Sequence, residues 1–264
     1  MDGLFGVRTT GIYCVTGCPS RAARAENVVP FSSAEEAEGA GFRACKRCLP
    51  QTGCVDSQGF AVWPGVLSAA QCAGLVANYG DSDLFRSRVV MSRHNFGRGE
   101  YQYFAYPLPK LLAGLRDRWY ARLAPIASRW TGRAFPATHA EYLAECHAAG
   151  QSRPTPLLLQ YGAGDYNCLH QDLYGPLVFP LQVAVLLSDG FTGGEFVLTE
   201  QRPRMQSRAI VVPLRKGDAV VFPVHTRPVA GTRGTYKVNM RHGVSQIRSG
   251  SRHTLGVIFH DAAV

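Results

Sequence analysis

Two histidines and an aspartate in the second half of the chain have the types and spacing of metal ligands. His170 and Asp172 are separated by one residue, so in a strand both side chains point to the same face. Non-haem Fe(II) sites use two imidazoles and one carboxylate and leave the opposite coordination positions open for a co-substrate and O2. His242 is the preferred third ligand because Arg252 follows it by ten residues, and His225 is the alternative.

Four cysteines near the start of the chain have the spacing of a second metal site. Cys14 and Cys18 form a CxxxC pair, and Cys45 and Cys48 form a CxxC pair. Zn²⁺ prefers four soft ligands in a tetrahedron, which two short-spaced pairs supply. In a reducing compartment such pairs indicate zinc, with a disulfide as the alternative. The other four cysteines are expected to pack as small apolar side chains: Cys54, Cys72, Cys146 and Cys168.

The elements that must position these ligands differ along the chain. Residues 1–52 are rich in turns and short elements, which is typical of a small α/β module that needs a metal for its stability. Segments 67–80, 109–131 and 137–149 have the apolar spacing of helices, and Pro125 is expected to kink the second of them.

From Pro156 onward the sequence pattern changes to short apolar runs separated by glycine, proline and polar turns. The runs are PLLLQYG, LQVAVLLS, GEFVLTE, AIVVPL, DAVVFPV, NMRHGVSQI and HTLGVIFH. Regularly spaced strands after helices predict a sandwich or jelly roll with helical cover. The expected fold class is therefore α+β. A zinc-binding α/β module is followed by a double-stranded β-helix domain over 60–264, with a helical lead-in at 60–150 and a jelly-roll core at 155–262.

The positive charge of the chain is unevenly distributed. The formal net charge is +9, yet residues 1–60 hold six Lys/Arg and six Asp/Glu, which cancel. Between Gln201 and His253 there are eleven basic residues and one acid, Asp218. A basic field of this kind favours a polyanionic partner such as a nucleic acid. The alternative is a generic solvated surface.

Two classes of protein are disfavoured by the distribution of apolar residues. The chain has no run of about 18 apolar residues, so no transmembrane helix is expected. The N-terminal segment MDGLFGVRTTGIYC lacks a basic region followed by a long apolar stretch, so it does not resemble a signal peptide. A cytoplasmic protein is expected.

The residues around the four cysteines extend the zinc motif. The chain reads F-x-V-R-T-T-G-I-Y-C-x3-C-P-x-R, then E-N-V at 26–28, then E-A-x-x-A-G-F-R-x-C-K-R-C-x-P. Over residues 5–50 this closely resembles the metal-binding domain of the Ada family of DNA methylphosphotriester repair proteins. The resemblance implies that Cys14 accepts a methyl group from a DNA phosphotriester. It also implies phosphate contacts by Thr10, Arg21, Arg43, Lys46 and Arg47.

Zinc chemistry is consistent with this role, because a thiolate is the nucleophile and zinc keeps it deprotonated. The sequence departs from the family between Cys14 and Cys18, where Val-Thr-Gly replaces the usual Arg-Pro-Ser. A structural zinc module that directs the protein to DNA is therefore the alternative.

Five motifs carry a second resemblance. They are LLLQYG at 157–162, HQDLYG at 170–175, TGGEFVL at 192–198, KGDAVVFP at 216–223, and RHGV with SGSRHTLGVIFH at 241–260. This segment resembles the Fe(II)/2-oxoglutarate dioxygenase superfamily, in particular bacterial members grouped as nucleic-acid oxygenases. The resemblance implies 2-oxoglutarate and O2 as co-substrates. Arg252 would pair with the far carboxylate of 2-oxoglutarate through two hydrogen bonds, and Tyr161 would touch this co-substrate. Tyr161 matches AlkB-type repair oxygenases, whereas the Arg252 spacing is closer to the prolyl-hydroxylase branch.

Further candidates surround these ligands: Tyr166, Asn167, Tyr174 and Arg241 are expected either to line a substrate pocket or to pack at its rim. Together the motifs predict a DNA-alkylation repair enzyme. Its oxygenase part would hydroxylate an N-methyl carbon and release formaldehyde, on a base flipped out of DNA or, alternatively, RNA. Two other functions remain open: a DNA-binding methylation sensor or regulator, and a dioxygenase of a protein or small molecule.

Overall fold

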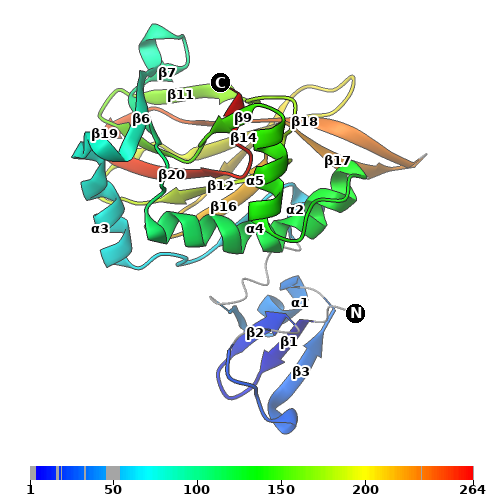
Figure 1. The fold of residues 1–264 in the computed structure, drawn as a ribbon. Helices are drawn as coiled ribbons and strands as arrows, with labels where there is room; N and C mark the ends of the chain where they lie inside the picture. Colours follow the sequence, from blue (N-terminus) through cyan, green and yellow to red (C-terminus); the bar gives the residue numbers. More distant parts are fainter. Residues whose placement is uncertain are drawn as a thin grey trace.

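A computed structural model describes residues 4–15, 18, 20–32, 34–45, 54–232 and 234–263. Its first part is a small sheet of four strands in the order β3-β1-β2-β4, with one short helix packed on it (Figure 1). The elements are β1 Leu4–Val7, β2 Ile12–Val15, η1 Ala25–Asn27, β3 Val28–Phe31, α1 Ala34–Gly39 and β4 Arg43–Ala44. Tyr13, Ala37 and Ala44 form a small core with Phe31 and Phe42 packed against it. So small a core supports the expectation that this part depends on a metal for its stability.

The second part contains two antiparallel sheets that face each other. The seven-stranded sheet has the order β5-β16-β12-β20-β10-β8-β6, and the six-stranded sheet has the order β15-β14-β18-β11-β7 with β17 also paired to β18. The bounds of the first sheet are β5 Ala61–Trp63, β6 Phe85–Val90, β8 Glu100–Phe104, β10 Leu157–Tyr161, β12 Leu181–Leu186, β16 Ala219–Pro223 and β20 Arg252–Ile258. Those of the second are β7 Gly97–Arg98, β11 Tyr166–His170, β14 Phe196–Gln201, β15 Arg208–Val212, β17 Thr226–Gly231 and β18 Gly234–Val244.

Helices cover the seven-stranded sheet on the face that the other sheet does not (Figure 1). They are α2 Cys54–Gln58, α3 Ala69–Ala77, α4 Lys110–Thr131 and α5 His139–Ala148. All six residues of β12 are buried, because apolar side chains meet the helices on one side and the second sheet on the other. On the helix side Trp119 of α4 packs on Trp63 with ring centroids 5.9 Å apart. The helix α4 continues through Pro125.

Two pairs of short strands complete the description. They are β9 Gln151–Arg153 with β21 Ala262–Ala263, and β13 Thr192–Gly193 with β19 Ile247–Ser249. The second pair brings the β18–β20 connection against the loop before β14. Within the described residues, no helix is both long and apolar enough to span a bilayer.

The α+β class and the jelly-roll-type sandwich are present, and helices form in the three segments where they were expected. The expected helical lead-in at 60–150, however, is incomplete. Besides α3, α4 and α5, this segment contains the strands β5, β6, β7 and β8. The strand β8 (EYQYF) alternates aromatic with charged or amide residues, and β6 (FRSRVV), the edge strand that pairs with it, contains two arginines and a serine. The polar residues that interrupt their apolar ones conceal both strands from a search for hydrophobic runs.

A buried ion pair fastens α4 to the end of the last long strand. The side chains of Arg116 and Asp261 are 1% and 0% exposed, and Nη2 of Arg116 lies 2.8 Å from Oδ1 of Asp261. The same guanidinium donates to the Ile258 carbonyl and to the Tyr106 hydroxyl. Burial raises the pKa of Asp261, but the charge and hydrogen bond of Arg116 outweigh burial and keep that pKa below its ordinary value.

Replacing Arg116 should therefore strongly destabilise the second part of the chain. An Arg116→Met variant removes the guanidinium from the buried Asp261 carboxylate, which keeps only its contacts with Tyr106 and His147, and we expect the free energy of unfolding to fall by about 3–5 kcal/mol. Urea denaturation followed by circular dichroism measures this. The matched control is Arg129→Met, whose ion pair with Asp56 has side chains 58% and 44% exposed. That change should cost less than about 1 kcal/mol, and equal losses in the two variants would contradict the prediction.

Candidate active site and metal centres

Three cysteine sulfur atoms converge in the first part of the chain. Cys14 lies in β2, Cys45 follows β4, and with Cys18 their Sγ atoms all lie within 4.8 Å of one another. The Sγ atoms of Cys18 and Cys45 are 3.7 Å apart. A disulfide would bring them to about 2.0 Å, whereas two sulfurs on one tetrahedral Zn²⁺ with Zn–S bonds of about 2.3 Å lie about 3.8 Å apart. The geometry therefore fits zinc. Cys48 lies outside the described residues.

The residues expected to contact phosphate lie on the surface of this module where the structure describes them. Thr10 sits in the turn between β1 and β2 and donates to the Val7 carbonyl oxygen, at 3.2 Å. Arg21 and Arg43 are both exposed, and Arg43 lies in β4 opposite Ile12 of β2. Lys46 and Arg47 are outside the described residues.

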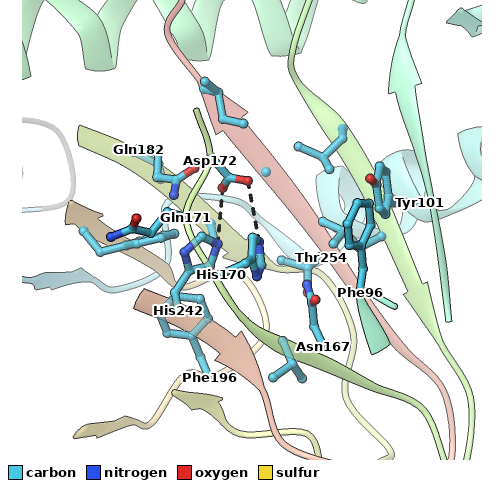
Figure 2. Close-up of a pocket in the computed structure, with 18 of the residues that line it drawn as sticks. Phe96, Tyr101, Asn167, His170, Gln171, Asp172, Gln182, Phe196, His242 and Thr254 are labelled. Atoms are coloured by element: carbon cyan, nitrogen blue, oxygen red, sulfur yellow. Dashed lines mark ion pairs between the residues drawn. The ribbon is translucent and has the colours of Figure 1, made fainter. Parts of the chain in front are cut away.

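A second cluster, His170, Asp172 and His242, lies between the two sheets. The strands β11 and β18 pair so that His170 and His242 stand directly opposite each other, and their ring centroids are 4.1 Å apart. Asp172 follows the end of β11, and its two carboxylate oxygens reach Nε2 of His170 at 3.5 Å and Nε2 of His242 at 3.3 Å (Figure 2). One potential ligand atom from each residue lies within 4.8 Å of the other two, which is the spacing a single metal ion needs.

The rival histidine, His225, is not part of this group of three. It follows β16, and its backbone carbonyl oxygen accepts a hydrogen bond from Gln171. Its imidazole Nδ1 is buried and has no hydrogen-bond partner within the described structure.

Hydrogen bonds prepare the cluster for a cation. Nδ1 of His170 lies 2.8 Å from the Cys168 carbonyl oxygen, which can only accept, so Nδ1 carries the proton and Nε2 is free to bind a metal. The hydroxyl of Tyr174 donates to Oδ1 of Asp172 at 2.8 Å and in turn accepts from Tyr103 at 3.0 Å. Each of these bonds fixes the orientation of a ligand.

Burial and mutual attraction set the protonation of the cluster. Burial raises the pKa of Asp172, but the adjacent His242 and His170 and the Tyr174 hydroxyl outweigh it and hold that pKa well below its usual range. Burial, together with the positive charge that His242 can carry, lowers the pKa of His170. At neutral pH the cluster therefore offers an ionised carboxylate and a neutral His170 imidazole, the forms that bind a cation.

A buried arginine lies in the same cavity, which has a volume of about 220 Å³. Arg252 stands opposite Tyr161 in the pairing of β20 with β10, and its guanidinium carbon lies 5.7 Å from the centre of the Tyr161 ring. Its Nη1 donates to the Thr254 hydroxyl. The side chain is 1% exposed, its Nε has no hydrogen-bond partner, and no carboxylate pairs with it in the described part of the chain. A buried guanidinium without a counter-ion fits a carboxylate ligand, as 2-oxoglutarate would provide.

The structure adds residues to the cavity that the sequence did not single out. Phe96, Tyr101 and Tyr103 line it from the segment that was expected to be helical. Of the four pocket candidates, Asn167 and Tyr174 line the cavity; Tyr166 and Arg241 do not, and Arg241 lines a neighbouring groove..

Comparisons with known proteins agree with this description. Residues 99–262 match the profile of a family described as an oxygenase catalysing oxidative methylation of damaged DNA, and residues 2–51 match the metal-binding domain of Ada. An uncharacterized protein of Mycobacterium tuberculosis (strain H37Rv) is 49% identical over 168 residues, covering 61% of this chain and 72% of the relative. The bifunctional transcriptional activator/DNA repair enzyme Ada of Escherichia coli is 54% identical over 48 residues, covering 18% of this chain and 14% of Ada.

Among solved structures, a prolyl hydroxylase from Trichoplax adhaerens, in complex with a hypoxia inducible factor peptide, is similar with a TM-score of 0.52. The sequence identity is 14%, and the match covers 80% of this chain and 87% of that one. At this identity the likeness shows the fold alone, a jelly-roll-type sandwich.

If His242 is the third ligand, its removal should abolish iron binding whereas removal of His225 should not. We expect His242→Ala to weaken Fe(II) binding by at least about 100-fold, because losing a ligand costs more than losing an outer hydrogen bond. Anaerobic Fe(II) titration of the two variants measures this. Weak binding in His225→Ala together with retained binding in His242→Ala would reverse the assignment.

The Tyr174 hydroxyl should be needed to hold Asp172 in place. We expect Tyr174→Phe to weaken Fe(II) binding or activity by about 10–100-fold, the usual cost of an outer hydrogen bond to a ligand. The matched control is Tyr79→Phe, which removes a hydroxyl that donates to Glu100 at 3.1 Å outside the cavity. The same Fe(II) titration applies, and identical affinities in the two variants would refute the role of Tyr174.

Proposed function

Because the chain belongs to the family of oxygenases that act on damaged DNA, we propose that it repairs alkylated DNA bases with Fe(II) held by His170, Asp172 and His242. The observation that carries the proposal is a single cavity containing both this cluster and a buried, unpaired guanidinium, that of Arg252. The first feature fits a metal with open coordination positions. The second fits the far carboxylate of a keto acid, so the cavity fits both components of the reaction.

Bound Fe(II) and 2-oxoglutarate would supply the oxidation of an N-methyl carbon by O2, with succinate, CO2 and formaldehyde as products. The protein's own part is to bind and orient. Arg252 and Thr254 would hold the far carboxylate, while Tyr161 packs beside it and closes that side of the cavity. The neutral His170 and ionised Asp172 keep the metal bound without a proton having to leave at neutral pH.

The cavity mouth supports a nucleobase as the substrate. Phe96 and Leu173 line the cavity and are also 47% and 52% exposed, so they present apolar surface at its entrance. A base flipped out of the stack could enter between such side chains and reach the metal. The ring of His94 stacks on Phe96 with centroids 5.3 Å apart, which supports the Phe96 ring from behind.

For the first part we propose an Ada-type zinc module that binds DNA and transfers a phosphotriester methyl group to Cys14. Four thiolates on Zn²⁺ carry a formal charge of about −2, and methylation of one leaves about −1, which lessens repulsion of phosphate. Thr10, Arg21 and Arg43 are exposed and available for phosphate contacts, with Lys46 and Arg47 added from the family motif. A thiolate site requires a reducing compartment, which supports a cytoplasmic location.

The decisive test measures formaldehyde released from N-methylated single- and double-stranded DNA with Fe(II), 2-oxoglutarate and O2. We expect His170→Ala to lower release by at least about 100-fold, since it removes a metal ligand. Cys14→Ala should keep the release but lose methyl uptake from methylphosphotriester DNA, measured as an increase in protein mass. Parallel arms contain methylated RNA and a proline-containing peptide.

Equal formaldehyde release by wild type and His170→Ala would refute the oxygenase assignment. Turnover stimulated by the peptide and not by DNA would move the substrate to the protein class. Methyl uptake by Cys14→Ala equal to that of wild type would leave the zinc module a structural role.

A further inference from the structure

The outer face of the six-stranded sheet has two grooves that continue from the iron cavity. Gln171 lines both the cavity and the first groove, which has a volume of about 190 Å³. Gln201 and Asn239 line both the first groove and the second, whose volume is about 310 Å³. Because they share lining residues, the cavity, the first groove and the second groove lie one after another. Gln171 lies on the opposite side of the metal-ligand cluster from Phe96 (Figure 2). The grooves therefore begin on the Gln171 side of the cavity.

The strand β18 gives this outer face its cations. Val238, Met240 and His242 are buried toward the other sheet, and the residues between and before them are exposed on the opposite face. Arg241 lines the first groove and Lys237 the second. Four residues of strand span about 13–14 Å, so these two cations are as far apart as about four stacked nucleotides.

The chemistry of the lining suits a phosphate backbone. Besides the cations, the grooves present amide and hydroxyl groups, including Thr199, Ser207 and Asn239, which hydrogen-bond phosphate and sugar oxygens in DNA complexes. Among the described lining residues of the two grooves there is no carboxylate and no aromatic ring. Bases would therefore not be stacked there, and the contacts would be to the backbone.

A buried cluster strengthens the positive field at the second groove. The Glu200 carboxylate is 2% exposed and faces three guanidinium groups, those of Arg202, Arg208 and Arg227. One negative and three positive charges leave a formal excess of two positive charges. Burial raises the pKa of Glu200, but its hydrogen bonds from Arg227 and Arg202 outweigh burial and lower it, so the carboxylate stays ionised. Arg202 itself lines the second groove.

From these features we infer that the two grooves bind the DNA strand on one side of the target nucleotide, through phosphate contacts by Arg241, Lys237 and Arg204. The inference rests on the proposed function and adds to it the path of the DNA strand over the protein surface. The damaged base enters the cavity, and the strand passes Gln171 and runs across the outer face of β18 and β14. Gln171 is suited to mark this passage, because its amide donates to the carbonyl oxygens of His225 and Met240 and is thereby fixed.

The test is the salt dependence of binding of a methylated single-stranded oligonucleotide to the full chain, followed by fluorescence anisotropy. The slope of log K against log salt is negative, and each lost phosphate contact reduces its magnitude by about 0.7. The double variant Lys237→Gln/Arg241→Gln should therefore reduce the magnitude of the slope by about 1.4. Arg204→Gln/Lys237→Gln, which leaves the neighbours of the iron ligands unchanged, should do the same. The matched control, Lys110→Gln/Arg118→Gln, removes two exposed cations from α4 and should keep the wild-type slope.

Strand direction provides a second measurement. Two oligonucleotides are compared, one extending only 5′ of the lesion and the other only 3′. The difference in slope between wild type and the groove variants should appear with one of them and not with the other. An unchanged slope in both groove variants, an equal loss in the α4 control, or an equal effect for both extensions would overturn the inference. So would an equal change of slope when a polyglutamate peptide of the same charge replaces DNA.

These outcomes separate the groove from the proposed function. If wild type releases formaldehyde from methylated DNA and the slopes are equal, the enzyme assignment stands and the groove assignment fails. If wild type releases none while the slopes differ as expected, the chain binds a strand across β18 and the repair assignment fails.

Discussion

The candidate active site depends on a buried carboxylate placed between two imidazoles. A buried charge is costly unless it is paired and hydrogen-bonded. Asp172 meets this requirement with His170, His242 and the Tyr174 hydroxyl, each within 3.5 Å. Because the two histidines come from strands that pair directly, their separation is fixed by backbone hydrogen bonds. The site can therefore hold its geometry before any ligand binds, as precise coordination of a metal requires.

The cavity also joins the two sheets. The histidines belong to the six-stranded sheet, whereas Arg252 and Tyr161 stand opposite each other in β20 and β10 of the seven-stranded sheet. A metal and an anion held from opposite sheets stay in register as long as the sheets remain packed. The helix α4 and the buried pair Arg116–Asp261 hold the outer side of the seven-stranded sheet, so they support the site without touching it.

Sequence reasoning was most successful where one local pattern determines one element. Apolar runs predicted β10, β12, β14, β16 and β20, and the spacing of two singled out His170 and Asp172. It failed where position depends on contacts between distant segments. The strands β6 and β8, at the sheet edge and next to it, carry charged and amide residues, and the lining role of Phe96 follows from its loop lying against β11, where the Cys168 amide donates to the Phe96 carbonyl. The bond between Tyr174 and Asp172 likewise follows from how the chain turns after β11, which spacing alone does not determine.

The distribution of charge gives a physical reason for joining the two parts. Lys/Arg and Asp/Glu cancel over residues 1–60, and a zinc-bound cluster of four thiolates would repel phosphate, less strongly once one thiolate is methylated. The first part alone therefore has little long-range attraction for DNA. The basic excess lies between Gln201 and His253, much of it on β18 and its neighbours. If that surface holds a strand, the tether keeps the thiolate module at a high local concentration near the backbone that it could not attract by itself. The oxygenase part would then supply the affinity, and the zinc module would sample the phosphates within reach of the tether.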